Sequence, residues 1–163
     1  MVGQRMNRNF RVVGLIAAFL VMAFCGYQMA QVPLFGWFTF PFLLAFWAFL
    51  VLLTARRYNP RWLTLSTLSG VLLVLGFPIS PFTPLMFIAF VPLLIVEKEI
   101  TAQNTRVRQN RIMRYAFNAF VIYNIGTTWW VGNAGLAAGM IANFLNAFSC
   151  AFPFGCFIKR IAF

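Results

Sequence analysis

The sequence predicts an all-α integral membrane protein with about six transmembrane helices and both termini in the cytoplasm. Two observations predict this fold class. The first is composition: the 163 residues are 62% hydrophobic and only 9% charged, whereas soluble domains are typically about 25% charged. A chain of this size could not hide so many apolar residues in water, because small domains have a large surface for their volume. The second observation is the order of the charges along the chain.

Loops that alternate between basic and uncharged separate the apolar runs. The six runs are Val12–Ala30, Trp37–Ala55, Trp62–Phe77, Leu85–Val96, Tyr115–Val131 and Leu136–Ile158. All thirteen basic residues fall at the N-terminus, in alternate loops or at the C-terminus, and the loops between hold none. Short cytoplasmic loops retain Lys and Arg. We therefore expect both termini and the hydrophilic segment 97–114 to face the cytoplasm, and we attribute the net charge of +11 to topology rather than to nucleic-acid binding.

Two of the runs are short. Trp62–Phe77 and Leu85–Val96 have fewer than the about 20 residues that a crossing helix needs. They either borrow turns from their flanks or form a hairpin that does not cross fully, and both arrangements leave the termini on one side. In the first run, Phe24 precedes Cys25, where a lipid-attachment box needs a small residue. We therefore expect that run to be an uncleaved anchor.

Two adjacent tryptophans, Trp129 and Trp130, follow two threonines near the end of the fifth run. Counted as a helix from Arg114, they lie about 22 to 24 Å across the membrane, at the far interface. Indole rings are enriched at headgroup depth, where the N–H finds a polar partner. We expect Trp129, Trp130 and Asn133 to contact lipid or the interface. An ordinary interfacial belt is the simpler interpretation, and an acyl-chain site is the other.

Small and polar residues form a stripe on the sixth run. Gly135, Gly139, Asn143 and Asn146 recur at spacings of 4, 4 and 3, which places them on one helix face. Small residues let another helix approach closely, and the amides can form hydrogen bonds across the contact. We expect this stripe to pack against a helix of the same chain; a partner subunit or a lipid groove is the alternative.

Catalytic and metal-binding constellations are missing from the sequence. There is no His, and the two acidic residues, Glu97 and Glu99, lie in the hydrophilic segment, so no base is expected within the membrane or beyond it. Three cysteines, Cys25, Cys150 and Cys156, cannot complete a four-ligand metal site without histidines. We therefore expect no catalytic residue, no metal and no cofactor. A channel or transporter is disfavoured because no charge lies inside an apolar run.

Three segments carry a family resemblance: LSGVLLVLGFPISPFTPLMFIAFVPLLIVEKEI from Leu68, RYAFNAFVIYNIGTTWWVGNAG, and ANFLNAFSCAFPFGCFIKR. In order, they contain a Leu-rich helix that ends in a Phe-Pro turn, then a helix that contains Pro-Leu-Leu and is followed by acidic residues. A basic loop and a helix that ends in Thr-Thr-Trp-Trp come next. Over roughly residues 68–160 the sequence resembles the N-terminal membrane portion of apolipoprotein N-acyltransferase, particularly in Bacteroidetes forms. The resemblance implies a multi-pass protein of the bacterial inner membrane. In that family the helices hold phospholipid and the lipoprotein's diacylglyceryl cysteine beneath a nitrilase-like domain with a Glu-Lys-Cys triad.

The resemblance divides the chain at its basic second loop. We expect residues 1–61 to be a two-helix N-terminal addition and residues 62–163 to be a four-helix membrane segment. The nitrilase-like domain is not part of the resemblance, and no residue can be assigned to the triad. One hypothesis is therefore a non-catalytic accessory subunit of a larger bacterial membrane complex, with other integral membrane subunits as partners. The alternative is the lipid-binding membrane part of an acyltransferase. Both expect membrane phospholipid as a partner, no nucleic acid, and no activity of the chain alone.

Overall fold

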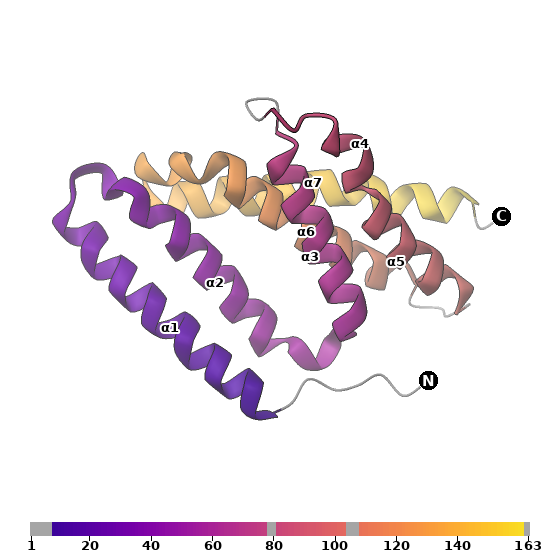
Figure 1. Cartoon of the computed structure of the whole chain (residues 1–163), viewed down its shortest axis with the longest axis horizontal. Helices are drawn as coiled ribbons and strands as arrows, with labels where there is room; N and C mark the ends of the chain where they lie inside the picture. Colours follow the sequence, from indigo (N-terminus) through magenta and orange to yellow (C-terminus); the bar gives the residue numbers. More distant parts are fainter. Residues whose placement is uncertain (1–7, 78–80, 104–107, 162–163) are drawn as a thin grey trace. The chain divides into compact units, whose positions relative to one another are not determined.

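The computed structural model describes residues 8–77, 81–103 and 108–161, and within these ranges the side chains of all but Pro33, Arg108 and residues 154–161 (Figure 1). Every regular element in the described ranges is a helix, and no strand occurs there. This result confirms the predicted all-α fold class.

Three helices of the described residues are long and apolar enough to cross a bilayer. They are Arg8–Gln31, Leu34–Leu53 and Leu136–Pro153, with mean hydropathies of 2.0, 2.0 and 1.3. Pro60–Leu75 is apolar but shorter, and a crossing helix needs about 20 residues. These helices fit a membrane protein, whereas six spans with cytoplasmic termini stay a prediction.

The chain forms two compact units, each built from two stretches of sequence. The first unit comprises Met1–Pro60 and Thr128–Asn143, and the second comprises Arg61–Thr127 and Phe144–Phe163. The division at residues 61 and 62 that the sequence suggests follows a family resemblance rather than packing, and it stays a prediction.

A helical hairpin forms most of the first unit. Helix α1 (Arg8–Gln31) and helix α2 (Thr39–Leu53) are joined by the turn η1 (Pro33–Phe38) and run in opposite directions (Figure 1). Gly14 of α1 allows close packing, because a Cβ atom added there would lie 2.9 Å from the Cδ1 atom of Leu52. The short turn and the close packing hold the two helices against each other.

The turn η1 has an unusual backbone. Three successive residues, Leu34, Phe35 and Gly36, have φ angles of 55°, 58° and 53°. Glycine adopts this left-handed region readily, but a residue with a Cβ atom loses about 1–2 kcal/mol there. Leu34 and Phe35 therefore hold a conformation that neighbouring contacts must stabilise.

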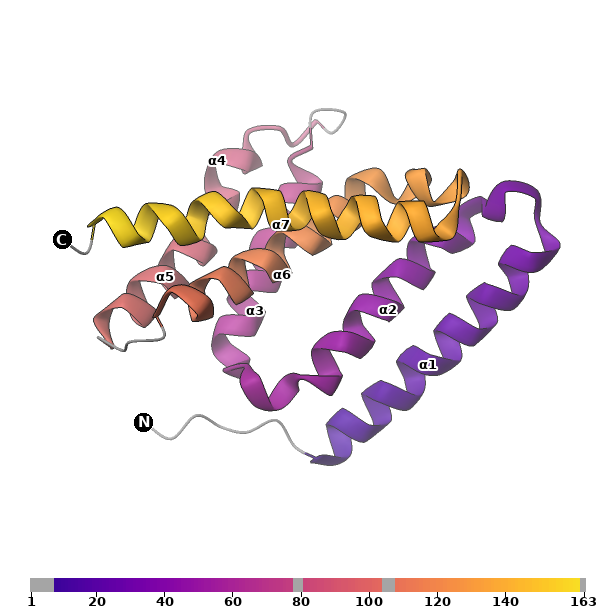
Figure 2. The same cartoon turned by 180° about the vertical axis from the view of Figure 1, so that it is seen from behind.

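The second unit contains four helices and the C-terminal part of a fifth. They are α3 (Pro60–Leu75), α4 (Leu85–Ala89), α5 (Val91–Ala102), α6 (Arg108–Thr128) and, from Phe144 on, α7 (Leu136–Ile161). The C-terminal part of α7 returns alongside α6 (Figure 2).

The fourth apolar run differs from its expected form. The sequence suggests one element over Leu85–Val96, whereas the structure has two helices separated at Phe90. Pro92, in the first turn of α5, has no N–H with which to continue α4 into α5. Helix α5 also continues beyond Val96 to Ala102, so both acidic residues are helical rather than part of a connecting loop.

Buried polar side chains hold α3 against α6. The Ser66 hydroxyl donates to the Tyr115 carbonyl (2.5 Å) and accepts from Asn118 Nδ2 (2.9 Å). Asn118 is only 1% exposed. A Cβ atom added at Gly70 would lie 2.7 Å from the Ala119 carbonyl oxygen, so the backbones of the two helices nearly touch. Close packing with internally satisfied polar groups is typical of helices in lipid.

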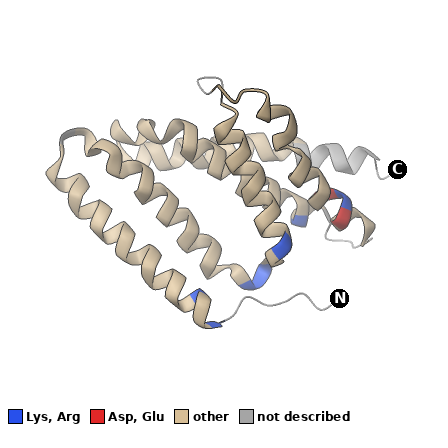
Figure 3. Cartoon of the chain, viewed as in Figure 1, with Lys and Arg blue, Asp and Glu red and all other residues tan. Residues whose placement is uncertain are grey.

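The charged residues lie at helix ends (Figure 3). In the first unit, one end of the hairpin collects them: Arg8 and Arg11 in the first turns of α1, and Arg56 and Arg57 just after α2. This grouping follows from the antiparallel hairpin and agrees with the alternate basic loops of the sequence. The side of the membrane on which they lie stays a prediction.

In the second unit, one ion pair joins α3 to α5. Arg61 Nη2 lies 2.7 Å from Glu99 Oε1, and Trp62 Nε1 donates to Glu99 Oε2 at 2.7 Å. The carboxylate therefore has two partners on the first turn of α3. This contact joins the acidic end of α5 to the start of α3.

Candidate functional site

The predicted tryptophan pair belongs to a cluster in the first unit that two turns build together. One turn is η1, between α1 and α2, and the other is η3 (Trp129–Asn133), which precedes α7. We call this cluster the paired-turn site, and its residues are Leu34, Gly36, Trp37, Thr39, Phe40, Trp129, Trp130, Gly132 and Asn133.

Threonine side chains and glycines shape η3. The Thr127 hydroxyl donates to the Tyr123 carbonyl one turn earlier (2.8 Å), which is a common use of Thr within helices. At Thr128 the backbone leaves the α-region (φ −126°, ψ 17°) and the helix ends. At Gly132 the missing Cβ leaves room for the Thr39 methyl group.

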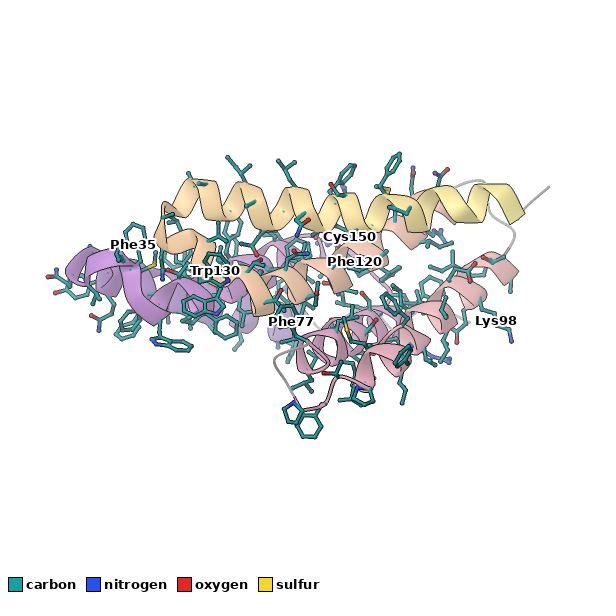
Figure 4. All side chains as sticks on the ribbon, turned by 90° about the horizontal axis from the view of Figure 1, so that it is seen from above. Phe35, Phe77, Lys98, Phe120, Trp130 and Cys150 are labelled. Atoms are coloured by element: carbon teal, nitrogen blue, oxygen red, sulfur yellow. The ribbon has the colours of Figure 1, made fainter. Side chains whose placement is uncertain are left out.

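The two tryptophans have different environments. Trp129 is partly buried and stacks on Trp37, with ring centroids 4.9 Å apart and planes 30° apart. Its edge also meets Phe40, with centroids 6.3 Å apart. Trp130 is 60% exposed and Trp37 is 76% exposed; Figure 4 shows Trp130 on its turn. Trp129 therefore anchors the turn, while Trp37 and Trp130 present indole surface outward.

The amide of Asn133 ties η3 to η1. The amide orientation that satisfies its neighbours has the nitrogen donating to the Thr39 hydroxyl (2.8 Å) and to the carbonyls of Leu34 (3.0 Å) and Gly36 (3.3 Å). Leu34 and Gly36 are two of the left-handed residues of η1. Because a left-handed backbone is costly for Leu34, a side chain that satisfies its carbonyl stabilises the turn and fixes the position of Trp37.

Two glycines bring the backbones of the site together. A Cβ atom added at Gly132 would collide with the Thr39 methyl group, and one added at Gly139 would collide with the Gly132 Cα. No other residue fits either position without a shift. The first turn of α7 is therefore packed directly on η3, which in turn is packed on α2.

Only part of the predicted small-polar stripe packs closely within the first unit. Gly139 makes the close approach just described. Asn143 is buried, donates to the Gly139 carbonyl (2.8 Å) and accepts from the Thr128 hydroxyl (3.0 Å). For Gly135, the nearest neighbour of an added Cβ would be Ala138 Cβ at 3.8 Å, an ordinary distance. Gly139 and Asn143 thus form the packed part of the stripe here.

The last member of the stripe belongs to the second unit. Asn146 Nδ2 donates to Asn124 Oδ1 at 2.6 Å, which joins α7 to α6. Two alanines that the sequence analysis did not single out, Ala147 and Ala151, are fully buried. They continue from Asn143 at intervals of four positions, so their helical register was the signal that could have found them.

The site offers surfaces and amides rather than acid–base groups. Among the residues that the structure describes, no group of three or more His, Cys, Asp or Glu side chains is placed to hold a metal. Cys25 and Cys150 are free thiols, and the side chain of Cys156 lies outside the described residues. Indole surfaces of this kind can contact apolar chains, and their N–H groups can donate to ester oxygens.

Comparison with known protein families identifies the family of the chain. Residues 69–162 match the model of the apolipoprotein N-acyltransferase N-terminal domain. The chain belongs to this family. The resemblance seen from Leu68 onward is therefore confirmed. No curated protein and no solved structure matches the chain.

The apolipoprotein N-acyltransferase domain supplies one half of the paired-turn site. Trp129, Trp130 and Asn133 lie within the matched residues 69–162. Their partners Trp37 and Thr39 lie before the match, on the α1–α2 hairpin. The site therefore joins the family domain to a hairpin that the family match does not cover.

Proposed function

We propose that the chain is a non-catalytic membrane segment in bacterial lipoprotein acylation, whose paired-turn site contacts phospholipid at the periplasmic surface of the inner membrane. The position of the site carries this proposal. The site joins the end of α1, the start of α2 and the start of α7, and these are the three helices that are long and apolar enough to cross a bilayer. The ends of crossing helices lie at the bilayer surface.

The positions of the basic residues support a periplasmic location of the paired-turn site. Within the first unit, Arg8, Arg11, Arg56 and Arg57 lie at the hairpin end opposite η1. Basic residues are retained in the cytoplasm. The end that carries η1 and η3 therefore faces the periplasm in this proposal.

The exposed rings support contact with lipid. Trp37 and Trp130 present indole surface outward, while stacking and hydrogen bonds hold their turns in place. An indole at this depth contacts acyl chains with its ring and ester oxygens with its N–H. Because the site has no charged side chain, we propose that it recognises the glycerol-ester region of phospholipid rather than a headgroup charge.

Quenching of tryptophan fluorescence by brominated phospholipid tests the proposal. The full chain is reconstituted in vesicles with bromine either near the ester groups or near the chain ends. We expect the shallow bromines to quench more strongly. Trp37→Phe and Trp130→Phe should each remove part of this shallow quenching.

Trp47→Phe is the matched control, because Trp47 is buried in α2 and its loss should leave the shallow quenching unchanged. Equal shallow quenching in the parent and in both exposed-ring variants would contradict lipid contact at the paired-turn site. Stronger quenching by deep bromines, lost in Trp130→Phe, would contradict the interfacial position.

An accessory subunit of a larger complex is the second candidate. One observation leads to it: α1 exposes large apolar side chains along its length, namely Phe10, Val13, Phe19, Phe24 and Tyr27. These side chains meet either lipid or a helix of another subunit. A photo-crosslinking residue at Phe19 distinguishes them in native membranes, since a subunit partner adds the mass of a protein, whereas lipid adds only the mass of a lipid molecule.

Both candidates make the same prediction for chemistry. Neither acidic residue lies at the paired-turn site: Glu97 and Glu99 are both on α5, and no residue matches the family's triad. We expect the purified chain, mixed with phospholipid and a diacylated lipopeptide, to yield no triacylated product. Product that persists after replacement of all three cysteines would overturn the non-catalytic assignment.

A further inference from the structure

A second surface, in the second unit, combines a charge with an aromatic groove. A shallow, open groove with a volume of about 360 Å³ is lined by Asn110, Met113, Arg114 and Phe117 of α6 and by Phe148 of α7. It lies wholly within the second unit and shares no residue with the paired-turn site. Its volume is at the low end of the range for ligand pockets, about 300–1,000 Å³.

The groove has a polar part and an apolar part. Positions 110, 113, 114 and 117 follow the spacing of one helix face. Most of the lining is apolar and includes Met113, Phe117 and Phe148, while Asn110 and Arg114, one turn apart, are its two polar residues. A ligand that fits this groove needs a polar group that accepts hydrogen bonds, joined to an apolar chain.

The apolar part continues beyond the groove. Phe148 and Phe152, one turn apart on α7, are both about half exposed, and their ring centroids lie 6.3 Å apart. Both residues belong to the apolar stretch Leu136–Pro153, a candidate span. A chain that leaves the groove along these rings would therefore remain on a surface suited to the bilayer.

The surrounding charge favours an anion. Arg111 and Arg114 lie in the first two turns of α6, and Arg111 donates to Gln103 (3.4 Å). Both acidic side chains of the second unit have partners outside the groove: Glu99 binds Arg61 and Trp62, and Glu97 accepts from Thr101 (3.2 Å). Among the residues that the structure describes, one cation and no carboxylate line the groove.

We propose that this groove binds one anionic phospholipid, with its phosphate at Arg114 and Asn110 and an acyl chain along Phe117 and Phe148. A guanidinium forms strong charge-assisted hydrogen bonds with phosphate, and basic pockets between membrane helices hold anionic headgroups. The lipid comes from the leaflet that meets the basic segments of the chain. The site is independent of the lipid contact at the paired-turn site, because it uses a different unit and a different headgroup chemistry.

Native mass spectrometry of the full chain, released from membranes of mixed phosphatidylglycerol and phosphatidylcholine, tests the proposal. We expect one phosphatidylglycerol retained in preference to phosphatidylcholine. Arg114→Gln should lower the affinity for phosphatidylglycerol about fivefold, which is the effect of one basic residue near an anionic lipid surface. Arg114→Lys should restore part of the binding, and this rescue separates charge recognition from a fold defect.

Lys98→Gln is the matched control. Lys98 is an exposed cation of the same unit that projects from α5 (Figure 4) and does not line the groove. Its loss removes the same charge and should leave lipid retention unchanged.

The apolar part of the groove has its own variant. Phe117→Ala should weaken retention of long-chain phosphatidylglycerol more than that of a short-chain form. Equal retention of both headgroups, or equal loss in Arg114→Gln and Lys98→Gln, would overturn the proposal. Displacement of the lipid by millimolar inorganic phosphate would also overturn it, because the groove would then bind the anion alone.

Discussion

The two units use the same kinds of polar side chain for different purposes. In the second unit, Asn118 is buried between α3 and α6 and binds Ser66, so its amide holds two helices together. In the first unit, Asn133 binds the carbonyls of a left-handed turn and holds an exposed ring in place. The first arrangement gives stability, and the second presents a surface. A membrane protein can therefore place amides for either purpose, and the surroundings of each amide decide which.

The largest expected effect is an all-or-none difference in cysteine labelling, which tests the orientation of the chain in the membrane. In a chain without its own cysteines, a cysteine placed at Thr83 or Ala134 should react with an impermeant reagent added outside the cell. One placed at Gln109 should react only after the membrane is opened. Ala134 is exposed and adjoins Asn133, whose amide is engaged. If the reagent added outside labelled only the cysteine at Gln109, the topology would be the reverse of the predicted one.

The next largest effect should come from Gly139→Leu, which attacks the paired-turn site through its backbone. The new side chain would collide with Gly132, and backbone atoms cannot move aside as a flexible side chain can. We expect a loss of about 1–3 kcal/mol or more, as is typical of overpacking, measured by thermal unfolding in micelles.

Gly135→Leu is the matched control for Gly139→Leu, because the nearest neighbour of an added Cβ at Gly135 lies at an ordinary distance. Equal stability of the two variants would show that the close approach of α7 to η3 is unimportant for the fold.

Some of this arrangement could be predicted from the sequence, because hydropathy and charge order depend on local composition. They predicted the apolar helices, whereas Gly139 was marked by a separate signal, the spacing of small and polar residues along α7. The break at Phe90 was missed, although Pro92 was a readable signal for it. The contacts of Glu99 with Arg61 and Trp62 could not be predicted, because these residues are distant in sequence.

The partners within the paired-turn site could not be predicted. Asn133 and Thr39 are 94 positions apart, and nothing in either stretch of sequence indicates the other. Trp129 and Trp130 are neighbours with the same side chain, yet one is packed on Trp37 and the other is exposed. The path of the backbone through η3 sets that difference, and it depends on close packing that a pattern of residue types does not contain.

A moderate effect should follow from Asn118→Leu in the second unit. The substitution removes the hydrogen bond to Ser66 and places a larger apolar group where α3 and α6 are close. We expect a loss of about 1 kcal/mol in thermal unfolding, with unchanged emission from the exposed tryptophans.

Ser149→Ala, an exposed polar position on α7, serves as the control for Asn118→Leu. If Asn118→Leu altered the shallow lipid quenching as strongly as the unfolding temperature, the contrast between the two units would fail.

A smaller loss of stability, with a clear spectral change, should follow from Asn133→Leu. Without the amide, the carbonyls of Leu34 and Gly36 lose their donor and the turn that carries Trp37 loosens. We expect a loss of under about 1 kcal/mol, together with reduced shallow quenching by brominated lipid. Asn133→Gln, which keeps the amide on a longer stem, should recover part of the quenching. Shallow quenching in Asn133→Leu equal to that of the parent would show that the turn does not need the amide.

The smallest effect should come from Asn146→Leu, because this amide lies at the exposed edge of the contact between α7 and α6. Its hydrogen bond to Asn124 is short, but measured bonds of this kind between membrane helices average about 0.6 kcal/mol. Leucine is also well accommodated by lipid, which offsets part of the loss. Phe148→Leu, on an exposed face of the same helix, should leave the unfolding temperature nearly unchanged and gives the baseline. If Asn146→Leu destabilised the chain as much as Gly139→Leu, the bond to Asn124 would be a principal contact of the second unit, and amides rather than small residues would hold α7 in place.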